Sequence, residues 1–366
     1  MPNLAARFAA AMMIAAFGGR ACAAEACPLY AADYDVAKVI EAMKRPKPNL
    51  VVLTPHRGLI EEHPENTLEA IKAAVDAGFE SVEIDLRMNR DHSLWLMHDA
   101  VADRLTTAVG YFSAYSDDAL KALGENHRSQ LIQVKDRHGK PTVQGLSQFE
   151  QVLDYQAERM PDRRRGFVLV VDIKSPVKDD PFISEIQVMN AFEKAVSKTA
   201  NRGLLNAVLF KMKAREITEH KDQFDRILQA YPQTPVMVTP VLHPNEEVAG
   251  NQIITAYLGN YRNFVGFETV VENDTQETAL GWWEQLLGAG RTVPAFLSWN
   301  EFPEGVAKSD ATCCVYRHVR PPGDLDFTGT VPWQLRLQGR WLTSDAAQFL
   351  HRFYCARDNR NLQSLR

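Results

Sequence analysis

The stretch that decides the fold runs from LVVLTPHRG (residues 50–58) through TLEAIKAAVDAG (residues 67–78) to SVEIDL (residues 81–86). Its first run is apolar and β-branched and breaks off at a polar loop, which is typical of a buried strand. The second run has apolar residues at helical spacing and stops at a glycine, as helices commonly do. A strand, a helix and a second strand in this order predict a parallel βαβ unit.

The same alternation continues along the chain. We expect a weak last strand around residues 339–343, and clearer strands at residues 167–173, 207–210, 235–241, 265–270 and 293–298. Helical patterns lie near residues 183–198, 214–220, 246–257 and 275–287. Eight such units favour a closed barrel over an open doubly wound sheet. The predicted fold class is therefore α/β, a (β/α)8 TIM barrel.

The interval between the second and third strands is too long for a simple connection. Residues 99–165 are rich in charge and contain several glycines. Loops of this length inside a compact domain usually carry structure of their own. We therefore expect an inserted lobe at about residues 101–145, beside the barrel mouth, followed by a barrel helix near residues 146–157.

The first residues have the pattern of a secretory signal. Arg7 precedes the apolar run 8–17, and small residues follow at 21–24, which matches the three regions of a signal peptide. The apolar run is too short to span a bilayer; a buried helix and a retained anchor are the alternatives. We expect residues 1–23 to be removed and residues 24–366 to form one exported domain, periplasmic or secreted, without a transmembrane segment.

Composition and charge bound the partners. The 366 residues are 45% hydrophobic and 24% charged, with a net charge of −5, so the chain has a globular composition and no basic footprint for nucleic acid. An anionic small molecule would have to be held by a local site. In an oxidising compartment the four cysteines of the mature chain permit three pairings, which the sequence leaves open; they are Cys27, Cys313, Cys314 and Cys355.

Ionisable residues stand where the first strands end. In a barrel of this kind, the C-terminal strand ends share one face, where active sites are built. The first strand is followed by His56 and Arg57, and a short extended piece at residues 94–97 is followed by His98. The second strand carries Glu83 and Asp85, and the third carries Asp172 and then Lys174.

Three of these residues are candidate metal ligands. Glu83 and Asp85 alternate with apolar residues, so both carboxylates project from the same face of one strand. Asp172 would add a third oxygen ligand, and an oxygen-only site suits Mg²⁺ or Ca²⁺. The alternative is that the carboxylates are salt-bridge partners of Arg57 and Lys174.

The remaining candidates suit proton transfer and phosphate binding. His56 and His98 titrate near neutral pH, as a general acid and base require. Arg57 and Lys174 could hold phosphate oxygens, the arginine through its planar fork and the lysine as a point charge.

Several short motifs follow one another in a single window of the sequence. They are His56-Arg57-Gly58, Pro64-Glu65-Asn66-Thr67, the segment from Ala77 to Leu86, His98-Asp99 and the segment from Arg104 to Thr107. In order, spacing and residue type they resemble the glycerophosphodiester phosphodiesterase family. The resemblance is dense from about residue 51 to residue 107, recurs at residues 170–174 and is faint afterwards, returning at Leu342-Thr343-Ser344-Asp345.

The resemblance implies a reaction and a set of roles. It implies metal-dependent hydrolysis of glycerophosphodiesters to glycerol 3-phosphate and an alcohol, with His56 and His98 as acid and base. It further implies that Arg57 and Lys174 contact phosphate and that one divalent cation, Ca²⁺ or Mg²⁺, binds at Glu83, Asp85 and Asp172. The family usually has a glutamate where this chain has Asp172, which puts the mode of metal binding at that position in question.

Three other readings compete with this one. A related barrel phospholipase would act on a membrane lipid headgroup and would expose aromatic residues at the mouth, for which Tyr111, Phe112 and Tyr115 are candidates. A non-catalytic barrel could bind glycerophosphate compounds, but binding alone requires no histidine pair. A secreted structural protein would leave the charged strand ends unexplained.

Overall fold

The structure, a computed structural model, describes residues 32–60, 62–121, 133–136, 139–175, 180, 187–232, 235–258, 261, 263–269, 277–297, 306–307, 325–326 and 340–366. The expected signal peptide and Cys27, Cys313 and Cys314 lie outside these residues. Cys355 is a free thiol. Among the described residues, we find no helix of the length and apolarity that crossing a membrane would require.

Eight strands form the barrel, which confirms the predicted fold class. β3, β6, β7, β8 and β9 form one parallel ladder, and β10, β13 and β2 form another. β2 also lies beside β3, and β9 beside β10, so the two ladders complete a ring. The strands are β2 (Val52–Pro55), β3 (Ser81–Met88), β6 (Val168–Ile173), β7 (Val208–Lys213), β8 (Met237–Leu242), β9 (Glu268–Thr269), β10 (Pro294–Leu297) and β13 (Trp341–Ser344).

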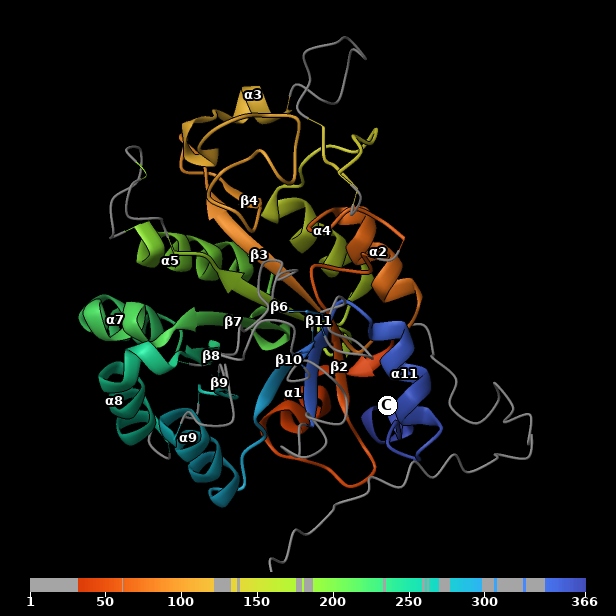
Figure 1. The fold of residues 1–366 in the computed structure, drawn as a ribbon, viewed down its shortest axis with the longest axis vertical. Helices are drawn as coiled ribbons and strands as arrows, with labels where there is room; N and C mark the ends of the chain where they lie inside the picture. The colour runs from red at the N-terminus through yellow and green to blue at the C-terminus, as the bar shows by residue number, and fades with distance from the viewer. Residues whose placement is uncertain are drawn as a thin grey trace, which may run out of the picture.

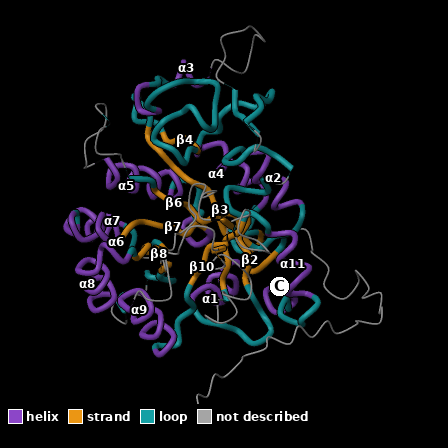
Figure 2. Tube along the Cα trace, viewed as in Figure 1, coloured by secondary structure: helices purple, strands orange, loops and turns teal. Residues whose placement is uncertain are grey.

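Helices surround the strands (Figures 1 and 2). Each buries an apolar stripe against the ring, as Ala70, Ile71, Ala74 and Val75 of α2 do, and this burial is the main stabilising term. The helices around the ring are α2 (Leu68–Asp76), α4 (Phe149–Arg159), α5 (Gln187–Ala200), α6 (Ala214–Glu219), α7 (Lys221–Ala230), α8 (Glu247–Tyr257), α9 (Glu277–Gly288) and α11 (Ala347–Cys355).

Outside the inserted lobe, two of the described helices were not expected from the sequence. α1 (Val36–Lys44) begins at Asp35, whose carboxylate accepts hydrogen bonds from the backbone of Ala37 and Lys38, a regular N-cap. α7 follows α6 after a break at His220, and its buried stripe is short. α7 is polar outside a few apolar positions, so its pattern is hard to separate from a loop, whereas α1 has apolar residues at helical spacing that could have predicted it.

A buried ion pair ties the C-terminal segment to the start of β3. Arg360 donates to both carboxylate oxygens of Glu80, at 2.5 and 2.9 Å, and both side chains are fully buried. Glu80 also accepts the backbone N–H of Leu53, and Arg360 donates to the carbonyl of Val51. The pair therefore joins the strands β2 and β3 to the end of the chain.

The inserted lobe has its own small core. It includes β4 (Leu94–Leu96), which pairs antiparallel with β3, the 3-10 turn Phe112–Ala114 and α3 (Asp117–Lys121), and it projects at the top of Figure 1. Its apolar cluster consists of Trp95, Met97, Ala102, Leu105, Ala108, Phe112 and Leu120. The structure thus places a separately packed lobe between the second and third barrel strands, as predicted.

Four further short strands form pairs outside the ring. β1 (Tyr34–Asp35) pairs antiparallel with β5 (Arg165–Gly166), just before β6 begins. β11 (Val306–Ala307) pairs with β12 (Leu325–Asp326). The first of these pairs brings α1 against β2 and β6.

Candidate active site

The loop after β2 is built from residues with unusual backbone geometry. Arg57 has φ of 59° and Gly58 has φ of 88°. A side chain at Gly58 would place its Cβ 2.7 Å from the backbone of Ala70 in α2, so only glycine fits there. A non-glycine residue with positive φ is strained, and Arg57 is held in place by its backbone N–H, which donates to Glu83 at 3.0 Å.

Asn66 joins this loop to β3. It also has positive φ, 57°, which asparagine tolerates better than most residues. Its side chain donates to one oxygen of Asp85 at 2.8 Å and accepts the backbone N–H of Asp85 at 2.9 Å. The next residue, Thr67, caps α2 by accepting from Ala70. This short segment thus orients a carboxylate and starts a helix at the same time.

The three candidate metal ligands lie together. Glu83, Asp85 and Asp172 each offer an oxygen, and these oxygens are within 4.8 Å of one another. Asp85 and Asp172 are register partners on the neighbouring strands β3 and β6. Burial, and then the charge of Asp85, raise the pKa of Glu83 to about 7. An oxygen-only set with a carboxylate that is costly to ionise fits a hard divalent cation.

Basic residues also contact these carboxylates, as the salt-bridge alternative predicted. Lys174 lies 2.8 Å from oxygens of both Asp85 and Asp172, and Arg57 Nε lies 3.0 Å from Asp85. Burial opposes the ionisation of Asp85, but Lys174 and Arg57 outweigh it and hold its pKa well below the usual value. Burial likewise opposes the charge of Lys174, yet Asp172 and Asp85 raise its pKa. Lys174 therefore carries its full charge at this cluster.

Each candidate histidine is held by a carboxylate at Nδ1. His56 Nδ1 lies 2.6 Å from Asp345, which follows β13, and its Nε2 lies 3.9 Å from Glu83. Burial and Arg57 oppose the protonation of His56, but Asp345 and Glu83 prevail and raise its pKa. His98 Nδ1 lies 2.5 Å from Asp99. A carboxylate at Nδ1 fixes the ring orientation and assigns proton transfer to Nε2.

Sequence reasoning missed several residues at the barrel mouth. Asp345 lies in a faintly matching segment far from His56 along the chain. On β7, Lys211 pairs with Glu268 of β9 at 2.6 Å and lies 3.9 Å from Asp172. His243 follows β8. A lysine within the apolar run of β7 was the one local signal that could have identified Lys211.

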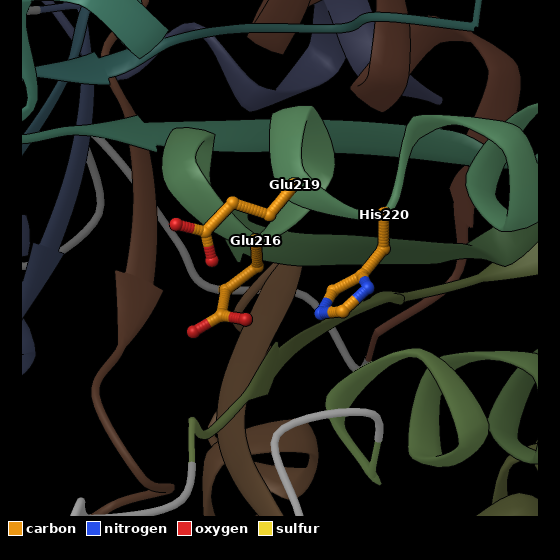
Figure 3. A group of neighbouring side chains, drawn as sticks. All are labelled: Glu216, Glu219 and His220. Atoms are coloured by element: carbon orange, nitrogen blue, oxygen red, sulfur yellow. The ribbon is translucent and has the colours of Figure 1, made fainter.

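A second group with metal-ligand spacing lies at α6. Glu216, Glu219 and His220 offer ligand atoms within 4.8 Å of one another, and Figure 3 shows their side chains on one side of the short helix. Glu219 is half-exposed and already pairs with Arg215 at 2.7 Å. This group is therefore separate from the carboxylates between β3 and β6.

Comparisons with known proteins identify the family of this chain. The model of the glycerophosphoryl diester phosphodiesterase family matches residues 56–257. A relative from Sinorhizobium fredii, the uncharacterized protein y4eD, is 27% identical over 83% of this chain and 82% of its own length. A glycerophosphodiester phosphodiesterase from Caldanaerobacter subterraneus is 34% identical over 42% of this chain, and the chain spans 59% of that relative.

A solved structure shares the fold. The glycerophosphoryl diester phosphodiesterase from Parabacteroides distasonis superposes with a TM-score of 0.53, at 15% identity, over 91% of this chain and 92% of its own. The family match covers more than half of the chain and contains all seven expected site residues. The chain belongs to the glycerophosphoryl diester phosphodiesterase family.

Proposed function

We propose that this enzyme hydrolyses glycerophosphodiesters to glycerol 3-phosphate and an alcohol, with a divalent cation and a histidine acid–base pair. One observation carries the proposal: both histidines have Nδ1 bound to a carboxylate, at the same barrel mouth as three clustered carboxylates. An acid–base pair needs two such oriented rings, whereas a binding protein does not. We further propose that the protein is exported and that residues 1–23 are removed.

The roles of the residues follow from their chemistry. Glu83, Asp85 and Asp172 would hold Ca²⁺ or Mg²⁺, and a cation bound there supplies positive charge to the phosphate oxygens as the reaction proceeds. Arg57 and Lys174 are charged groups at the same cluster and bind phosphate oxygens. One histidine removes a proton from the nucleophile, either water or the neighbouring glycerol hydroxyl, and the other protonates the departing alcohol oxygen. Attack by water gives glycerol 3-phosphate directly, whereas attack by the hydroxyl gives a cyclic phosphate that water then opens in a second step.

The aromatic residues of the lobe offer little to a membrane. The phospholipase alternative rested on Tyr111, Phe112 and Tyr115. Phe112 is buried in the lobe core and Tyr115 packs against that core, whereas Tyr111 is half-buried. The lobe also exposes Val101, Val109 and Val143, so we propose small glycerophosphodiesters as the substrates and test the lipid directly.

The experiment is release of glycerol 3-phosphate from glycerophosphocholine and glycerophosphoethanolamine by the purified protein, with Ca²⁺, with Mg²⁺ and with chelator. We expect release that stops with chelator and falls at least about 100-fold in His56→Ala and His98→Ala, as general acid–base groups contribute that much. His92→Asn, at an exposed turn of the lobe, is the matched histidine control and should keep wild-type turnover. Full turnover in either site variant, or release that persists with chelator, would refute the proposal. Release of phosphocholine from phosphatidylcholine vesicles instead would favour the phospholipase.

A further inference from the structure

Arg104 contacts two carboxylates that serve different parts of the site. It lies in the inserted lobe, in the segment after His98 and Asp99. Its Nε donates to Asp99 at 2.6 Å and one terminal nitrogen donates to the other Asp99 oxygen at 3.1 Å. Its terminal nitrogens also donate to both oxygens of Glu65, at 2.9 and 3.0 Å. One guanidinium thus makes two bidentate contacts, a geometry available to arginine and not to lysine.

The two carboxylates continue the chain of contacts into the site. Oδ1 of Asp99, which accepts from a terminal nitrogen of Arg104, also lies 2.5 Å from Nδ1 of His98. Oε1 of Glu65, which accepts from a terminal nitrogen of Arg104, also accepts from Arg57 at 2.6 Å. The contacts therefore run without a gap from His98 to Arg57.

This series of contacts links the inserted lobe to the loop between β2 and α2. Glu65 and Arg57 belong to the loop between β2 and α2, and His98 follows β4, an antiparallel strand at the edge of β3 that is not part of the barrel ring. The backbone of His98 is held by Arg87, which donates to its carbonyl at 2.8 Å. The His98 ring depends on Asp99, and Asp99 in turn depends on Arg104.

The shifts in pKa are consistent with strong contacts between Arg104 and its two carboxylate partners. Burial disfavours the charge of all three groups. Even so, hydrogen bonds from His98 and Arg104 lower the pKa of Asp99, and the charge of Arg57 together with Arg104 lowers the pKa of Glu65. The same partners, Glu65 and Asp99, raise the pKa of Arg104. The contacts therefore favour the ionised form of all three groups.

We propose that Arg104 is a positioning residue for the hydrolysis: it holds Asp99 against His98 and Glu65 against Arg57, and so fixes the lobe's histidine relative to the barrel's phosphate-binding arginine. The inference rests on the proposed function, because it assigns Arg104 to the residues that carry that reaction. Arg104 itself touches no reacting atom. Its contribution is the orientation of groups that do.

The first test compares Arg104→Met, Arg104→Lys and Arg104→Ala with Arg90→Met, a control at an exposed arginine of the same lobe. Loss of such supporting contacts typically costs about 10–100-fold in activity. We expect that loss mainly in kcat for Arg104→Met, with partial recovery in Arg104→Lys, which can serve one carboxylate. Guanidinium ion at millimolar concentration should restore Arg104→Ala at least tenfold, while sodium chloride at equal ionic strength should not. Activity of Arg104→Met within twofold of wild type, or no rescue by guanidinium, would overturn the proposal.

A second test needs no substrate and so separates this inference from the proposed reaction. With ¹⁵N-labelled histidine, the wild type should show His98 protonated at Nδ1, and Arg104→Met should show a mixture of the two ring tautomers. The double variant Arg104→Met/Asp99→Asn should lose clearly less activity than the product of the two single losses, because both changes break the contact that holds His98, and only the Glu65 contact is lost in addition. An unchanged His98 tautomer in Arg104→Met, or activity losses that multiply in the double variant, would refute the positioning role of Arg104. If the wild type releases no glycerol 3-phosphate, the proposed function fails, and the tautomer spectra still decide whether Arg104 orients His98.

Discussion

The contact between Asp345 and His56 predicts a small loss of activity for Asp345→Asn and a larger loss for Asp345→Ala. Its 2.6 Å hydrogen bond is charge-assisted, and such bonds contribute about 1.5–3 kcal/mol, against about 0.5–1.5 kcal/mol for neutral ones. Asp345→Asn keeps the size and loses the charge, so it should cost about 1–1.5 kcal/mol, or about fivefold to tenfold in kcat/KM. Asp345→Ala removes the bond and should cost about 10-fold to 150-fold.

The assay is release of glycerol 3-phosphate at saturating divalent cation, with kcat and KM measured separately. Asp358→Asn, an exposed aspartate near the end of the chain, is the matched control and should change neither constant. Thermal unfolding of each variant distinguishes loss of orientation from loss of fold. The reasoning fails if Asp345→Ala stays within twofold of wild type, or if Asp345→Asn is as poor as Asp345→Ala.

Three further predictions concern stability and processing. Arg360→Met leaves the fully buried Glu80 unpaired and should lower the free energy of unfolding by about 3–5 kcal/mol, whereas Glu80→Met/Arg360→Met should recover most of it; urea unfolding of the two variants gives the comparison, and equal losses would contradict it. Burial, and then the charge of Lys213, lower the pKa of His243 to about 4, so the unfolded chain binds a proton between pH 6.5 and pH 4 that the folded chain does not, and stability falls as pH falls through that window. His243→Asn should remove up to about 3 kcal/mol of this pH dependence, and an unchanged slope would argue against the buried neutral ring. Finally, we predict that the exported protein begins at Ala24, which mass spectrometry of its N-terminus will show, and a retained residue 1 would exclude cleavage.

The barrel was predictable because its signals are local. Apolar runs of strand length, such as residues 50–54, and helical spacing, such as residues 67–77, need only a few neighbouring residues to be recognised. The position of Glu83 and Asp85 on one face followed from the strand period in the same way. α7 was missed because it has a narrow apolar stripe in a polar segment, whereas the apolar spacing of α1 was a local signal that could have predicted it.

The contacts between distant residues were beyond local reasoning. Asp345 is 289 positions from His56, and Lys211 meets Glu268 only because β7, β8 and β9 are neighbours in the ring. Arg104 belonged to a matching motif, yet its two carboxylate partners depend on how the lobe packs over the β2–α2 loop. Periodicity identifies which residues share a face, whereas the closure of the barrel decides which faces meet.

The placement of His98 on the inserted lobe has an evolutionary consequence. A barrel alone would hold the carboxylates, Arg57 and His56, but it would lack half of the proposed proton-transfer pair. A lobe exchanged between relatives would therefore have to bring its histidine together with matching partners for Glu65. We expect lobe sequences and the loop after the first barrel strand to vary in concert, so that changes in substrate choice arise through paired substitutions across this junction.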